Sequence, residues 1–177
     1  MQASDPTAKL GKGFALIAWL LLLAVIYLLF DDAIAAKLNP NQQLKSSLNA
    51  QGQQQVTLLP NAQGHYVGTL QLNGVDVVFL LDTGATVVAV STAVAKRTGM
   101  QQGQPYQVRT ANGVTTAYQS QIHELKLGTI VLKDLPASIV PNLTTTKGST
   151  EILLGMSALK HLEFAQQANQ LQLIQRN

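Results

Sequence analysis

An uncharged apolar run near the start of the sequence constrains this chain more than any other feature. Its eighteen residues, Gly13 to Phe30, include no charged residue, no proline and no amide side chain. A helix of that length measures about 27 Å at roughly 1.5 Å per residue, close to the ~30 Å hydrocarbon core of a bilayer. The run has no polar face to meet water, which disfavours a buried helix of a soluble core. We therefore predict one transmembrane helix over residues 13–30.

The charges on either side of this run predict its orientation. Lys9 and Lys12 precede it, whereas Asp31 and Asp32 follow it. Positively charged flanks tend to remain in the cytoplasm. We therefore expect residues 1–12 to be cytoplasmic, the helix to cross the inner membrane once, and the remainder of the chain to lie in the periplasm.

A cleaved secretory signal is the alternative interpretation. Ala33, Ile34 and Ala35 fit the small-residue pattern of a cleavage site. The apolar run is longer than the roughly 7 to 15 residues of such signals, which favours the membrane anchor. Under either interpretation, the rest of the chain is exported.

The composition changes abruptly after the apolar run. Residues 31–55 are rich in Asn, Gln, Ala and Ser and show no sustained hydrophobic period. We interpret them as a flexible linker, which as a coil spans about 25 to 30 Å. The remaining residues, 56–177, suffice for one folded domain and not for two.

The composition also excludes several functional classes. The chain has 12 basic and 9 acidic residues, a net charge of +3 and no cysteine. Disulfide scaffolds and cysteine-ligated metal sites are therefore excluded. With 12% charged residues, the chain is too poor in Lys and Arg clusters for a nucleic-acid-binding surface, so we expect no nucleic-acid partner.

The pattern of the exported part is typical of short strands separated by turns. Asn73-Gly74 lies between the apolar segments 66–72 and 75–81, which predicts a hairpin. Asn112-Gly113 predicts a second hairpin in the same way. Further strands are predicted at residues 106–110, 114–120, 122–127, 130–132, 137–140 and 171–174, and short helices at 91–98 and 156–162. This pattern indicates a small all-β barrel or sandwich with little helix.

One segment carries a specific chemical signal. The apolar strand ending in Phe79-Leu80-Leu81 leads into Asp82-Thr83-Gly84-Ala85, which places an aspartate in a tight turn. Further along, Leu153-Leu154-Gly155 again has apolar residues leading into a glycine, followed by a predicted helix. Together the two segments resemble the retropepsin-like (retroviral-type) aspartic proteases, and in particular their membrane-anchored bacterial branch.

This resemblance implies a fold and a catalytic loop. The fold is a small closed all-β barrel of the retroviral aspartic protease type with one or two short helices, preceded here by the transmembrane helix. Asp82 is implied to be the catalytic residue. Thr83, Gly84 and Ala85 complete the active-site loop, with the Thr83 hydroxyl pointing across to the loop of a second subunit.

The resemblance also assigns the surroundings of that loop. Asn112 and Gly113 fall where the family has its substrate-binding flap, and Leu153, Leu154 and Gly155 fall on the strand that flanks the loop. The segment after Gly155 departs from the viral pattern, because residues 156–159 are Met-Ser-Ala-Leu where viral enzymes have Arg-Asn-Leu-Leu.

The chemistry requires a second carboxylate. Peptide hydrolysis without a metal can use two neighbouring carboxylates that share one proton. Asp-Thr-Gly occurs once in this sequence, so one chain supplies half of such a pair. We therefore predict a homodimer with Asp82 of each subunit at the twofold axis, which cleaves extended segments of peptide or protein substrates and needs no cofactor.

Alternatives remain open at this point. The same cleft on the same fold can serve a non-catalytic periplasmic peptide-binding or adaptor module, although such a module needs no ionisable group in its floor. Asp82 can also be a turn aspartate that caps local amides. No metal site is expected, because the three histidines are far apart in sequence and Leu127 stands where a His123-Glu124 zinc-protease motif needs its second histidine.

Overall fold

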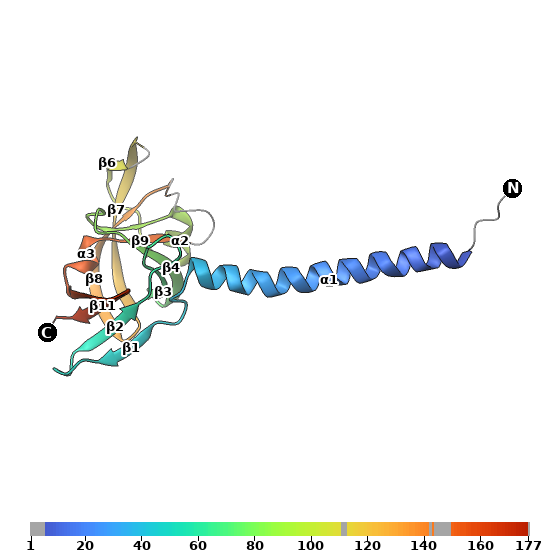
Figure 1. Ribbon diagram of the computed structural model, residues 1–177. Coiled ribbons are helices and arrows are strands. Elements are labelled where there is room, and N and C mark those ends of the chain that lie inside the picture. The colour runs from blue at the N-terminus through green and yellow to red at the C-terminus, as the bar shows by residue number, and fades with distance from the viewer. Residues whose placement is uncertain (1–5, 111–112, 142, 144–149, 177) are drawn as a thin grey trace. The chain divides into compact units, whose positions relative to one another are not determined.

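The computed structural model describes residues 6–110, 113–141, 143 and 150–176. It divides into two compact units, Met1–Lys37 and Leu38–Asn177. The first unit contains a single helix and the second contains all of the strands. Figure 1 shows the helix and the strands.

Helix α1 (Pro6–Leu38) forms the first unit. Its stretch Gly11–Leu38 is long and apolar enough to cross a membrane, and its large apolar side chains are exposed. A signal sequence near an N-terminus meets the same criteria. The helix extends beyond the predicted residues 13–30 at both ends, and after Phe30 it continues through alanines, which favour helix.

The second unit is built almost entirely from strands. They are β1 (Lys45–Leu48), β2 (Gln54–Leu58), β3 (Val67–Leu72), β4 (Val75–Leu81), β5 (Val88–Val90), β6 (Pro105–Thr110), β7 (Gly113–Leu127), β8 (Ile130–Ile139), β9 (Ile152–Leu154), β10 (Leu162–Gln167) and β11 (Gln170–Gln175). Two short helices, α2 (Thr92–Arg97) and α3 (Met156–Leu159), interrupt them. The predicted all-β class is therefore confirmed.

The larger sheet closes on itself. Its strand order is β3-β4-β9-β5-β8-β7-β6, and β3 also pairs with β7 through Gln71↔Lys126 and Leu72↔Leu125. This extra pairing joins the two sides of the sheet into a small barrel and leaves β6 outside the ring. Apolar side chains such as Phe79, Leu72 and Ile122 fill the interior with no exposed surface, so the barrel is a packed core.

A hairpin extends from this barrel. The first part of β7 pairs with β6 from Tyr118↔Pro105 to Gly113↔Thr110, beyond the end of its pairing with β8 at Tyr118↔Ile139. The hairpin projects from the top of the domain in Figure 1. The predicted second hairpin is thus present. Gly113 begins β7, while Asn112 lies outside the described residues.

Residues 39–55 differ from the prediction of a flexible linker over 31–55. Strands β1 and β2 belong to the second sheet, whose order is β1-β2-β11-β10. Asn41 is only 3% exposed, and its side chain exchanges hydrogen bonds with the N–H and carbonyl of Leu59 and with the carbonyl of Val67. The domain therefore begins near Leu38 rather than at Val56. Asn41 holds this segment through hydrogen bonds from a polar side chain to the backbone. Such bonds leave no hydrophobic period in the sequence, so the sequence pattern did not predict an ordered segment here.

Other predicted elements agree with the structure in most cases. The first hairpin joins β3 and β4, with Asn73 and Gly74 at the positive φ angles that such a turn requires. Ser91 caps α2 as expected for its predicted start. Helix α3 is shorter than the predicted 156–162, because Leu162 instead begins β10. The runs 130–132 and 137–140 fall in or beside one strand, β8, which continues through Pro136.

Replacing Asn41 is expected to destabilise the domain. Asn41→Ala leaves the N–H of Leu59 and the carbonyls of Leu59 and Val67 without this partner. We expect the free energy of unfolding to fall by about 2 to 3 kcal/mol, as for other buried polar groups that lose their partners. Urea unfolding of residues 38–177 measures it, with the exposed Gln63→Ala as the control. Equal stability of the two variants contradicts the structural role of Asn41.

Candidate active site

The loop after β4 carries Asp82 in a backbone-supported turn. The Asp82 N–H donates to the carbonyl of Leu154 at 3.1 Å, and the Asp82 carbonyl accepts from the Ala85 N–H at 3.3 Å. The Gly84 N–H donates to Asp82 Oδ1 at 2.8 Å. A Cβ at position 84 would lie 3.1 Å from the same oxygen. The turn therefore orients the carboxylate through backbone groups and keeps its approach open.

Strand β9 holds this loop at both ends. It lies between β4 and β5, running parallel to β4 (Leu81↔Leu154) and antiparallel to β5 (Ala89↔Leu153). Because β4 enters the loop and β5 leaves it, one strand supports both sides. All three residues of β9 are apolar, which suits a strand surrounded by sheet.

Gly155 lets the chain after β9 pass directly against the loop. A Cβ at this position would lie 2.3 Å from the carbonyl oxygen of Val87 and 2.7 Å from that of Ala85, so only glycine fits. Two hydrogen bonds then fasten the loop, from the Met156 N–H to Ala85 O at 2.8 Å and from the Val88 N–H to Ser157 Oγ at 2.9 Å. The close approach of the chain to Val87 and Ala85 explains why a glycine follows Leu153-Leu154.

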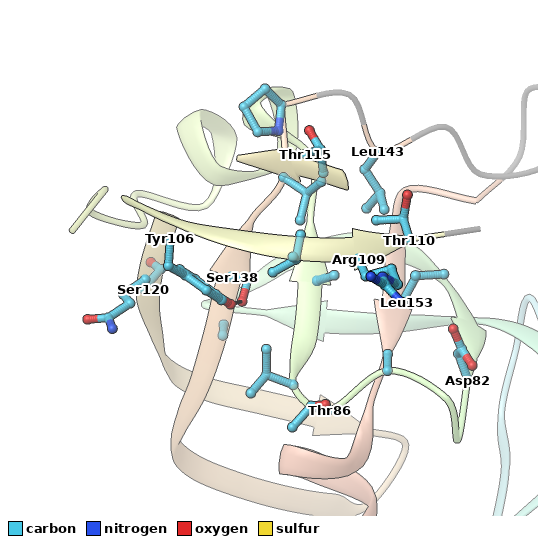
Figure 2. A pocket seen from close by; sticks show the side chains of 18 of the residues that line it. Asp82, Thr86, Tyr106, Arg109, Thr110, Thr115, Ser120, Ser138, Leu143 and Leu153 are labelled. Carbon is cyan, nitrogen blue, oxygen red and sulfur yellow. Dashed lines mark hydrogen bonds between the residues drawn. The ribbon is translucent and has the colours of Figure 1, made fainter. Parts of the chain in front are cut away.

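The loop lines a cavity of about 1530 Å³ beneath the β6–β7 hairpin. Asp82, Gly84 and Ala85 lie on one side, and residues of the hairpin, including Val108 and Gly113, lie on the other. Figure 2 shows the hairpin strand passing above the loop that carries Thr86 and Asp82. The arrangement is an open cleft with one carboxylate in its lining and a projecting hairpin as its cover.

The structure brings together most of the residues singled out in the sequence. Asp82, Gly84, Ala85, Gly113 and Leu153 line the same cavity. The remaining predicted residues that the structure describes stand beside it: exposed Thr83 in the loop, and buried Leu154 and Gly155 behind the loop.

Comparison with known proteins identifies the family. Residues 68–161, more than half of the chain, match the model of the family described as "gag-polyprotein putative aspartyl protease". This chain belongs to that aspartyl protease family. The matched residues include the Asp82 loop, the β6–β7 hairpin and β9, all of which contribute residues to the cavity lining.

The chain is also similar to individual proteins. The chain is 32% identical over 122 residues to the "Uncharacterized protein in cobV 5'region" of Sinorhizobium sp., a match that spans 67% of this chain and 50% of that protein. The chain thus spans about half the length of this curated relative. A retropepsin-like aspartic protease from Rickettsia conorii has the same fold, with a TM-score of 0.54 at 21% identity over 75% of this chain and 94% of the other. The protease of EIAV, complexed with the inhibitor HBY-793, gives a TM-score of 0.41 at 20% identity over 56% of this chain and 89% of its own.

Sequence reasoning missed a contact that joins the β6–β7 hairpin of this aspartyl protease domain to β8. The hydroxyls of Tyr106 on β6 and Ser138 on β8 share a hydrogen bond, and both residues line the cavity. Ser138 is buried. The alternation of Tyr106 and Val108 with exposed neighbours marks the side of β6 that faces the domain, but their partner on β8 is 32 residues away in sequence.

A second contact that the sequence did not predict lies outside the cavity, beside β4, the strand that leads into the Asp82 loop. Glu151 precedes β9 and accepts hydrogen bonds from the Val78 N–H at 3.0 Å and from Arg97, whose Nη1 lies 2.9 Å from Oε1. Partial burial raises the pKa of Glu151, but the hydrogen bonds and the charge of Arg97 outweigh it and lower the pKa below its usual value. The ionised carboxylate therefore ties α2 to β4 beside β9.

The Glu151 contact is expected to make stability depend on pH. Because the pKa of Glu151 is lower in the folded state, its contribution is present above the unfolded pKa of about 4.3 and disappears as the pH falls through the folded value. At neutral pH, Glu151→Gln should lower the free energy of unfolding by about 0.5 to 1 kcal/mol, since the pair is partly exposed. Thermal unfolding between neutral and acid pH tests this.

The control for that measurement is Glu163→Gln, whose partner Arg176 is 3.8 Å away at an exposed site. We expect it to leave stability nearly unchanged at every pH. A Glu151→Gln deficit that persists undiminished in acid contradicts the ionic origin of the effect.

Proposed function

We propose that this protein is a homodimeric aspartic endopeptidase with Asp82 of each subunit as its catalytic residue. The observation that carries the proposal is that Asp82, in the family's Asp-Thr-Gly loop, is the only carboxylate among the described residues that line the cleft. Glu151 is occupied by Arg97, and the carboxylates of Asp76, Glu124, Asp134 and Glu163 lie on exposed strand positions elsewhere. A second copy of the chain is therefore the source of the second carboxylate.

In the proposed reaction, the two Asp82 carboxyl groups hold one proton and a water between them. The ionised group takes a proton from the water, whose oxygen bonds to the peptide carbonyl carbon, while the protonated group gives its proton to the carbonyl oxygen. The C–N bond of the resulting gem-diol then breaks. As it breaks, the protonated carboxyl group gives its proton to the leaving nitrogen, and the ionised group takes a proton from one gem-diol hydroxyl. The dyad is again singly protonated, and one water is consumed for each bond cleaved.

The cleft shape favours an extended peptide as the substrate. The flap hairpin offers backbone groups along one side and the loop offers them along the other, so a peptide can bind as an added strand. Its side chains would point alternately to the two sides of the cleft. Apolar lining residues such as Val108, Val140 and Leu153 provide places for apolar side chains.

The apolar part of α1 supports a location at the membrane. We propose that residues 13–30 anchor the protein in the inner membrane, with residues 1–12 cytoplasmic and the protease domain in the periplasm, because the lysines precede the run and the aspartates follow it. Anchoring two chains in one bilayer raises their effective concentration and favours the dimer.

Asp82→Asn should abolish cleavage while preserving the fold. The amide oxygen of Asn can still accept the Gly84 N–H, but it cannot take a proton from water. We expect the cleavage rate of an unstructured protein substrate to fall by at least about 1,000-fold, with an unchanged melting temperature. Asp76→Asn, on the strand that leads into the Asp82 loop but outside the cleft, is the matched control and should remain active. Equal activity of wild type and Asp82→Asn refutes the mechanism. If the wild type binds peptides without cutting them, the adaptor function replaces it.

Mixing experiments test the requirement for two subunits. When subunits exchange freely, adding a threefold excess of the Asp82→Asn protein to wild type should reduce activity to about one quarter, because most wild-type chains then pair with inactive ones. An Asp76→Asn addition serves as the control and should not reduce it. Activity that stays constant on adding Asp82→Asn shows that a single chain is sufficient.

A further inference from the structure

The cleft contains an arginine that the proposed chemistry does not use. Among the described residues that line the cavity, Asp82 and Arg109 are the only charged ones. Arg109 belongs to β6, the proposed flap strand, where it pairs with Val114 one residue before the strand ends at Thr110. In Figure 2 this strand crosses above the loop that carries Asp82. A permanent positive charge therefore lies on the cover of the cleft.

This arginine differs from the other two in the chain. Arg97 pairs with Glu151 at 2.9 Å, and Arg176 lies 3.8 Å from Glu163. The side chain of Arg109 forms no ion pair or hydrogen bond with any residue in the part of the chain that the structure describes. Its guanidinium, with five N–H donors in a fixed plane, is available to a molecule that enters the cleft.

The neighbours of Arg109 indicate what kind of group it can recognise. Val114, which pairs with Arg109 across the hairpin and is 65% exposed, places an apolar side chain beside it, and both residues line the cavity. An apolar neighbour offers no hydrogen-bond acceptor that would compete with a carboxylate for the guanidinium. Two parallel N–H···O bonds to a carboxylate also fix the position of the bound side chain.

We infer that Arg109 is a specificity-determining residue, which selects peptides with an Asp or Glu side chain in the segment lying under the flap. This inference rests on the proposed function for the bound peptide and deepens it by naming a feature of the substrate. In the proposed dimer, each subunit contributes one Arg109, so one guanidinium lies on either side of the cleavage site. The dyad holds one negative charge, and the two arginines leave the cleft net positive.

Matched peptides test the inference in the full-length protein in detergent micelles. The peptides are acetylated and amidated at their ends, which removes terminal carboxylates, and carry one Asp, Asn or Lys at successive positions of a common apolar sequence. We expect the best Asp peptide to be cleaved at least about fivefold faster, as kcat/KM, than its Asn counterpart. Arg109→Gln should remove this ratio, whereas Lys133→Gln, an equal charge loss at an exposed site of β8 outside the cleft, should retain it.

Charge reversal separates recognition from a structural role. Arg109→Glu should invert the preference, so that the Lys peptide is cleaved faster than the Asp peptide, an effect that simple damage to the flap cannot produce. A ratio near one in the wild type, or an Asp preference unchanged by Arg109→Gln, overturns the inference.

Binding to the Asp82→Asn protein distinguishes failure of this inference from failure of the proposed function. Fluorescence anisotropy with the same peptides should show tighter binding of the Asp peptide than of the Asn peptide, and Arg109→Gln in the same background should abolish the difference. That result, with no cleavage by wild type, overturns the protease function and retains the selection of acidic peptides. Equal binding of the two peptides overturns the role of Arg109, whatever the cleavage assay shows.

Discussion

The site depends on the insertion of β9 between β4 and β5. This insertion requires the chain after β9 to pass against the loop, where a side chain at Gly155 would lie 2.3 Å from the carbonyl oxygen of Val87. Because the strand supports both ends of the loop, Asp82 is held by a buried sheet and not by the loop alone. In the proposed dimer this support matters, because two carboxylates that act together need closely defined positions.

The β6–β7 hairpin, the proposed flap, is supported less firmly than the Asp82 loop. The β6–β7 hairpin leaves the barrel, so its outer part lacks a covering layer and packs through a few contacts such as Tyr106 with Ser138. Elements with few buried contacts open at lower free-energy cost than core strands. The domain thus combines a firmly held carboxylate loop with a less supported hairpin above it, which suits the proposed binding of an extended peptide.

Much of this organisation could be predicted from the sequence because it depends on local signals. Asn73-Gly74 specifies a hairpin, Ser91 caps a helix, and an apolar strand running into Asp82-Thr83-Gly84 specifies the loop. The start of the domain could not be predicted in this way. Asn41 secures residues 39–55 through hydrogen bonds to Leu59 and Val67, and a polar residue with distant backbone partners has no periodicity to detect. The hairpin of β10 and β11 was also not predicted, because its two-residue turn, Ala168-Asn169, lacks the Asn-Gly signal of the other two hairpins.

The sequence by itself determined the apolar helix, the all-β class and the identity of the loop that bears Asp82, because hydrophobic period and turn chemistry act over neighbouring residues. Only the tertiary structure decided that β9 separates β4 from β5, that Glu151 pairs with Arg97, and that Arg109 shares a cavity with Asp82. Those relations join residues that are 27 to 73 positions apart. They arise when the sheet closes into a barrel, and no local pattern encodes which side chains that closure brings together.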